Sequence, residues 1–98
     1  MSYKKIPSKI RIKSKETYEV VWTDLIGENE KTLAECRYDH KQIVIKNGQS
    51  ETENWKCFIH ECLHAMEFEY RIPVPHKIVY LLEEAIFKLL KLNGFLNE

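Results

Sequence analysis

Two histidines and a glutamate in the segment FIHECLHAMEF, residues 58–68, are the side chains of this sequence best suited to metal chemistry. His60 and His64 lie four positions apart, so on a helix their imidazoles stand one turn apart and can reach a common point. That geometry supplies two ligands of a tetrahedral zinc ion. Glu61 lies too far round the helix to bind the same ion, but it can accept a proton from water on it. The HExxH pattern therefore predicts a hydrolytic zinc site; without a metal, it is a polar helix face with two exposed histidines.

A catalytic zinc site needs a third protein ligand, and the candidates after the motif are His76, Glu83 and Glu84. If a short break near residues 72–75 joins two antiparallel helices, a residue near position 83 lies beside His64. His76 would then lie about 10 Å away along the axis, at about 1.5 Å per residue. This geometry favours a glutamate and keeps His76 as the alternative for a bent helix pair.

The apolar pattern of the second helix distinguishes the two glutamates. Its stripe consists of Ile78, Leu82, Ala85, Ile86 and Leu89. Glu83 lies about 100° from the centre of that stripe, whereas Glu84 lies about 155° away on the lysine-rich side. Glu84 also has Lys88 four positions later as a helical ion-pair partner. The pattern predicts Glu83 as the ligand and Glu84 as its alternative.

Two further residues bear on whether the site is catalytic. Tyr80 lies one turn before Glu83 and is the best candidate to donate a hydrogen bond to an oxyanion; the alternative is a boundary aromatic that packs the helix pair. Cys57 lies one turn before His60, where it either completes a closed four-ligand site or is a buried thiol. A closed site would make the zinc structural and the chain a non-catalytic binding module.

Strand patterns precede the motif. The segments KIRIKSK and TYEVVWTDL are rich in alternating, β-branched and aromatic residues, and LAECRYDHKQIVIKNG predicts a hairpin that turns near Asp39 and His40. These segments predict an antiparallel sheet of three to four strands over about residues 8–47. Its segment QIVIK is a candidate edge strand that could bind an extended peptide.

Helix signals follow the strands. Ser50 and Glu53 match a capping box, which predicts a helix over about 51–71. Two prolines in IPVP end that helix, and the second helix should run over about 76–93, followed by Gly94 as a cap and a tail, 94–98. The sequence therefore predicts one α+β domain, residues 1–98, with a small sheet and then two long antiparallel helices.

Composition narrows the partners. Lys and Arg number 15 and Asp and Glu number 15, so no net field attracts nucleic acid, and no apolar run approaches a membrane span. Three cysteines without a CxxC pair, and an N-terminus without an apolar signal segment, favour a cytoplasmic protein. We expect a peptide or protein as substrate, and either a monomer or a dimer that exchanges a helix or the tail.

The HECLH motif followed by a glutamate on a later helix resembles the gluzincin zinc peptidases. Glu83 and Glu84 fit the two spacings at which those families place a ligand glutamate, and EEAI around Glu84 is similar to the thermolysin-type segment. Phe87 and Lys88 stand where gluzincins often carry a supporting aspartate.

The chain's size and its order of sheet and helices also resemble the minigluzincins, which are minimal soluble scaffolds of this type. That resemblance implies a zincin-like fold, zinc as the cofactor and hydrolysis of peptide bonds. It further implies that the C-terminal segment NGFLNE can hold the enzyme latent.

Overall fold

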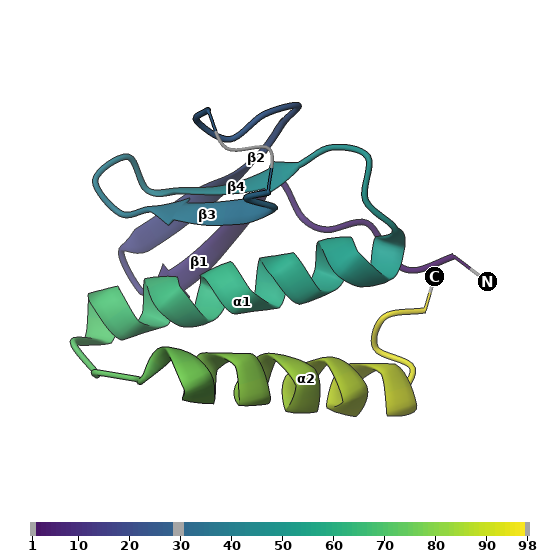
Figure 1. The fold of residues 1–98 in the computed structure, drawn as a ribbon. Coiled ribbons are helices and arrows are strands. Elements are labelled where there is room, and N and C mark those ends of the chain that lie inside the picture. The colour runs from purple at the N-terminus through teal and green to yellow at the C-terminus, as the bar shows by residue number, and fades with distance from the viewer. Residues whose placement is uncertain (1, 29–30, 98) are drawn as a thin grey trace.

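The computed structural model of this chain describes residues 2–28 and 31–97. The elements in chain order are β1 (Lys9–Lys13), β2 (Glu16–Thr23), β3 (Ala34–Arg37), β4 (Gln42–Lys46), α1 (Glu51–Tyr70) and α2 (His76–Leu92). The predicted α+β class, with a sheet followed by two antiparallel helices, is confirmed, and α1 lies between the sheet and α2 (Figure 1). Residues 29 and 30, within the region predicted to form the sheet, and residue 98 of the predicted tail lie outside the described residues.

The sheet is mostly antiparallel, with strand order β1-β2-β4-β3 and one parallel pair, β2 with β4. The predicted hairpin forms between β3 and β4, but it is β4 that lies beside β2. The side chains of Ile43, Val44 and Ile45 are each at most 1% exposed, as expected for a strand covered on both faces. The prediction that QIVIK is an edge strand is therefore wrong: β4 is internal, and β3 is the edge strand beside α1.

The main core lies between the sheet and α1. It consists of Tyr18, Val20, Ile43, Ile45, Phe58, Cys62 and Ala65. The sheet members alternate along β2 and β4, as the pleat requires, while the helical members come from one face of α1. The amide of Glu53 donates to Ser50 Oγ at 3.2 Å, so the first half of the predicted capping box is present. This core fixes α1 across the sheet and so fixes the position of the HExxH motif.

The connection between the helices turns sharply and then runs extended. Arg71 ends α1 in the left-handed conformation, at φ 55°, and its amide bonds back to the last turn of the helix. The amide of Ile72 donates to Glu67 O at 3.0 Å, and the amide of Val74 donates to Glu67 Oε2 at 3.2 Å. These bonds hold residues 72–75 back along α1, so the first turn of α2 starts beside α1 rather than beyond its end (Figure 1).

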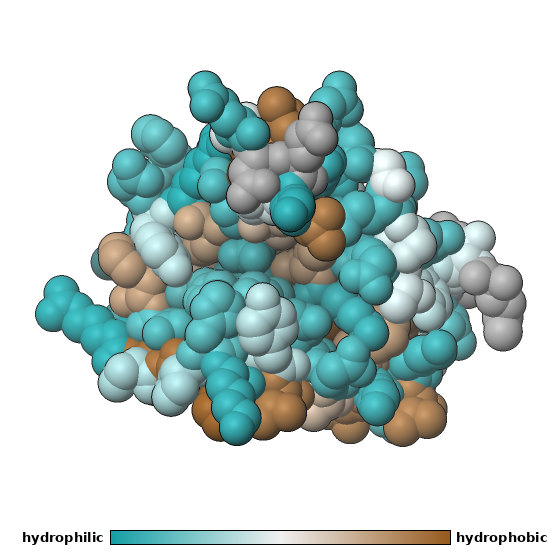
Figure 2. Space-filling model, in the orientation of Figure 1, coloured by the Kyte–Doolittle hydropathy of each residue, from teal (hydrophilic) through white to brown (hydrophobic). Residues whose placement is uncertain are grey.

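Most of the apolar stripe of α2 is exposed, and only Ile86, at its margin, packs against the cluster that contains Ile59 of α1. The side chains at Ile78, Leu82 and Leu89 are exposed, by 58% at Leu89, and Ala85 is exposed as well. The buried residues are instead Val79 and Phe87, which lie outside this stripe. Most of the stripe is therefore exposed, and brown, hydrophobic atoms gather along the lower margin of Figure 2.

The C-terminal segment folds back onto the N-terminal segment. Gly94 adopts φ 73° after α2, and the amide of Phe95 bonds to Leu90 O at 2.9 Å, which reverses the chain. Leu96 is only 2% exposed and packs with Ile59 and Phe87. The amide of Lys4 donates to Leu96 O at 2.6 Å. Within the described residues, neither helix is long and apolar enough to cross a membrane.

Candidate metal centre

Three histidines come together between the two helices. His60 and His64 lie on adjacent turns of α1, and His76 is the first residue of α2. The His76 ring centroid lies 5.4 Å from that of His60 and 5.2 Å from that of His64. One ligand nitrogen from each residue lies within 4.8 Å of the others, and among the described residues this is the group that could hold a metal ion.

The two histidines of the motif point the same nitrogen at each other. The Nε2 atoms of His60 and His64 lie 3.1 Å apart. Two nitrogens bound at about 2.0–2.1 Å to one tetrahedral zinc ion would lie about 3.3 Å apart. The spacing of these two atoms therefore fits a pair of ligands on a single ion.

The other nitrogen of each motif histidine faces a carboxylate. His60 Nδ1 lies 2.8 Å from Glu83 Oε1, and His64 Nδ1 lies 3.3 Å from Glu67 Oε1. A carboxylate at Nδ1 holds the proton there and leaves Nε2 free to bind a metal. Burial lowers the pKa of His60, which favours the neutral form that a metal needs, although Glu83 opposes that shift.

The position of His76 differs from the expected offset of about 10 Å. The expected offset used the helical rise of about 1.5 Å for every residue, including those of the connection. Residues 72–75 are extended instead, and an extended residue advances about 3.3 Å against 1.5 Å in a helix. The connection therefore carries the chain back past the last turn of α1, and His76 reaches both motif histidines.

Glu83 and Glu84 have different surroundings. Glu83 points at His60 from α2, and its side chain is 15% exposed. Glu84 forms an ion pair with Lys56 at 2.6 Å, and that lysine lowers the pKa of the Glu84 carboxyl. The structure thus brings Glu83 within hydrogen-bonding distance of His60. Glu84 instead contacts Lys56, which lies one turn before His60 on α1.

Glu61 is buried in the same region, with 7% of the residue exposed. Burial raises the pKa of its carboxyl to about 7, and the nearby charges of Glu35 and Glu83 act in the same direction. Such a carboxyl can take up and release a proton near neutral pH. His60 is buried as well, but outside the main core: residues of α2, among them His76 and Glu83, lie against its ring.

Tyr80 and Cys57 line the same hollow as the histidines. The Tyr80 ring stacks on His76, with centroids 5.0 Å apart and planes 12° apart, and more than half of the residue is exposed. The Cys57 thiol donates to Gln49 Oε1 at 3.7 Å, and burial raises its pKa to about 11. That shift disfavours the thiolate that would bind a metal, and Cys57 does not belong to the metal-binding group of the described residues.

The hollow measures about 480 Å³ and lies between β3 and the two helices. Its β3 wall includes Ala34, Glu35 and Cys36, and the segment before the strand contributes Lys31 to Leu33. Sequence reasoning missed Glu67 as a neighbour of the motif, although a carboxylate three positions after His64 is a helical contact that can be found from spacing. Glu35 was also missed, and only the sheet order places it near Glu61.

No family model matches this chain, and neither a curated protein nor a solved structure matches it. Any assignment of function therefore depends on the chemistry of this site.

Proposed function

We propose that this protein is a zinc-dependent peptidase, with His60, His64 and His76 as metal ligands. The observation that carries the proposal is the pair of Nε2 atoms 3.1 Å apart, each with a carboxylate beside its Nδ1. Paired carboxylates of this kind orient metal-binding histidines and raise their basicity. Glu83 is assigned to this supporting role at His60, and Glu67 to the same role at His64.

The donor set fits zinc in a catalytic site. Imidazole nitrogen is a preferred ligand of zinc, and three protein ligands leave a fourth position for water or substrate. His76 is exposed and lines the hollow. Its ligand nitrogen lies within 4.8 Å of those of His60 and His64, so a small rotation of this exposed side chain would bring the three nitrogens to one ion. A structural site would need a fourth protein ligand, and the described residues offer three histidines.

The chain's own residues have distinct roles in peptide hydrolysis. Zinc, when bound, would acidify a water molecule and polarise the peptide carbonyl. Glu61 takes a proton from the attacking water and returns it to the leaving amine. Tyr80, whose ring centroid lies 4.9 Å from that of His60, is assigned to donate a hydrogen bond from its hydroxyl to the oxygen that becomes negative.

The hollow also offers a surface for the substrate. β3 pairs with β4 on one side only, so its outer edge presents backbone groups beside the histidines. An extended peptide can add to such an edge through main-chain hydrogen bonds. That mode of binding suits unfolded segments or loops of proteins rather than compact folded surfaces.

The test combines metal content with hydrolysis of unfolded protein or peptide pools. We expect one zinc ion per chain in the wild type and in Glu61→Gln, with hydrolysis only in the wild type. Glu84→Gln is the matched control, because its carboxylate pairs with Lys56 and not with a histidine. Wild-type protein that takes up no zinc would overturn the proposal, and bound zinc without hydrolysis would instead support the structural-metal module.

A further inference from the structure

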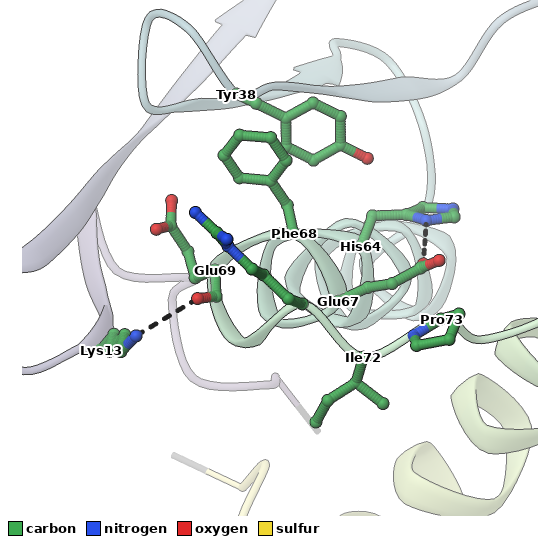
Figure 3. A pocket seen from close by; sticks show the side chains of 9 residues that line it. Lys13, Tyr38, His64, Glu67, Phe68, Glu69, Ile72 and Pro73 are labelled. Carbon is green, nitrogen blue, oxygen red and sulfur yellow. Dashed lines mark hydrogen bonds and ion pairs between the residues drawn. The ribbon is translucent and has the colours of Figure 1, made fainter.

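A second hollow adjoins the candidate metal centre. It measures about 690 Å³ and shares His64 and Tyr38 with the hollow that contains the three histidines. Its other walls come from the end of β1, the last turns of α1 and the start of the connection, as Figure 3 shows for Lys13, Glu69 and Pro73. A peptide that follows β3 past His64 enters this second hollow.

Two cations line the second hollow, and neither forms an ion pair within the described residues, although Lys13 lies close enough to Glu69 to help lower the pKa of that carboxyl. The guanidinium of Arg71 has no ion pair or hydrogen bond within the described residues. The ammonium of Lys13 donates to a neutral backbone oxygen, Glu69 O, at 3.3 Å and lies 5.2 Å from the centroid of the Tyr70 ring. Neither contact neutralises the charge, so both cations remain able to bind an anion.

The carboxylates in the same walls are already engaged. Glu67 accepts from Val74 and faces His64. Glu69 accepts from the Tyr18 hydroxyl at 2.6 Å and forms an ion pair with Lys41. Lys41 offsets the charge of Glu69, whereas Glu67 is held by a backbone amide and by His64. Both carboxylates thus have other contacts, and Lys13 and Arg71 are the cations of the hollow that form no ion pair among the described residues.

An aromatic surface forms the wall opposite the connection. The rings of Tyr38 and Phe68 stack with centroids 4.6 Å apart and planes 17° apart, and Figure 3 shows the two rings next to each other. Such a surface packs against the methylene groups of a side chain and leaves its charged end free. The combination of apolar wall and cations suits an aliphatic stem that ends in a carboxylate.

Arg71 stands at a position where glycine would be less strained. Its φ of 55° is in the left-handed region, which commonly carries glycine at the end of a helix. This backbone geometry also supplies a clean variant, because Arg71→Gly removes the guanidinium while relieving the strain.

We propose that the second hollow binds a carboxylate of the substrate, so that the enzyme prefers peptides with an acidic group a few residues from the cleaved bond. This proposal rests on the proposed peptidase function, because it assigns a substrate preference to that same site. The carboxylate can belong to an Asp or Glu side chain or to the C-terminus of the peptide. Arg71 binds it through two parallel hydrogen bonds, and Lys13 adds a second charge.

The experiment uses hexapeptide pairs that differ in one carboxylate. One series exchanges Glu for Gln at each internal position, and the other exchanges a free C-terminal acid for the amide. Binding to zinc-loaded Glu61→Gln is measured by calorimetry, and the resonances of Arg71 Nε–H and of the Phe68 ring are followed by NMR. If zinc does not bind, the peptidase proposal fails, and the same titrations are then made on the metal-free wild type. These titrations still test whether the second hollow binds a carboxylate.

We expect the acidic member of one pair to bind about fivefold more tightly at low salt, with the preference shrinking as the salt concentration rises. The Arg71→Gly exchange should abolish the preference without lowering the melting temperature, and Arg71→Lys should keep part of it. Arg11→Gln, an exposed charge change on β1, is the control that should keep it fully. Equal binding of every pair, no binding of any, or a preference that survives Arg71→Gly overturns the proposal.

Discussion

His60 Nδ1 lies 2.8 Å from Oε1 of Glu83, a residue from the middle of the second helix. Because the Nε2 atom of the same ring faces His64, Glu83 contacts the side of the His60 ring opposite the proposed metal position. The same separation of roles appears at His64, where Glu67 occupies Nδ1.

The first prediction distinguishes His76 from Glu83 as the third zinc ligand. We expect X-ray absorption of the zinc-loaded wild type to give three imidazole ligands, because three histidine rings converge. Glu83→Gln should keep all three and weaken zinc binding by about 10- to 100-fold, as loss of an orienting carboxylate does. His76→Ala should remove one imidazole. Two imidazoles in the wild type, unchanged in His76→Ala, would identify Glu83 as the ligand instead.

The second prediction concerns Tyr80. The change Tyr80→Phe keeps the ring that stacks on His76 and removes only the hydroxyl. If that hydroxyl stabilises the oxyanion, kcat should fall about 100- to 1,000-fold while KM and zinc content stay the same. Peptide hydrolysis under saturating and limiting substrate measures both constants. An unchanged kcat would leave Tyr80 with a packing role only.

The third prediction concerns pH and the Tyr18–Glu69 contact. Lys41 first, and then the Tyr18 hydroxyl, lower the pKa of Glu69 below its ordinary value of 4.5. The folded state therefore binds this proton less readily than the unfolded state, so the stabilisation is present above about pH 4.5 and is lost as the pH falls through the lower folded value. The change Tyr18→Phe should cost about 1.5–3 kcal/mol at pH 7.

Urea unfolding at several pH values measures this effect. The difference between wild type and Tyr18→Phe should narrow as the pH falls below about 4.5, because the folded state loses its advantage as Glu69 takes up a proton. Tyr70→Phe is the control, because its hydroxyl donates to a neutral backbone oxygen, Ile12 O, at 3.2 Å. A Tyr18→Phe penalty that stays constant from pH 7 to pH 3 would show that the ionised Glu69 does not contribute through this bond.

The fourth prediction concerns the C-terminal segment. Leu96 is buried against Ile59 and Phe87, and none of residues 94–97 lines the hollow around the histidines. Leu96→Ala should therefore lower the free energy of unfolding by about 2–4 kcal/mol. Removal of the residues after Gly94 should destabilise the protein at least as much and should not increase peptide hydrolysis per folded molecule.

Thermal unfolding and an active-site-normalised peptide assay test these expectations together. Asn97→Ala, at an exposed residue of the same segment, is the matched control. Faster hydrolysis after truncation, with stability unchanged, would favour the latency that the minigluzincin resemblance implies.

Local interactions made much of this protein predictable from its sequence. The i,i+4 spacing alone places His60 and His64 on one face of a helix, and it needs no partner element to do so. Ser50 and the two prolines of the connection fix the helix ends through backbone hydrogen bonds within a few residues. The β3–β4 hairpin is equally local, because its turn joins strands that are adjacent in the sequence.

Only the tertiary structure decided which residues complete the site. The rotation of α2 could not be inferred from its apolar stripe, since most of that stripe is exposed and the less apolar face, with His76 and Glu83, packs on α1. The extended connection then set how far along α1 that face begins. The order of the strands, with β3 at the edge, likewise depends on contacts between segments far apart in the chain. Sequence spacing thus determined the two histidines and their glutamate, whereas long-range packing determined what lies opposite them.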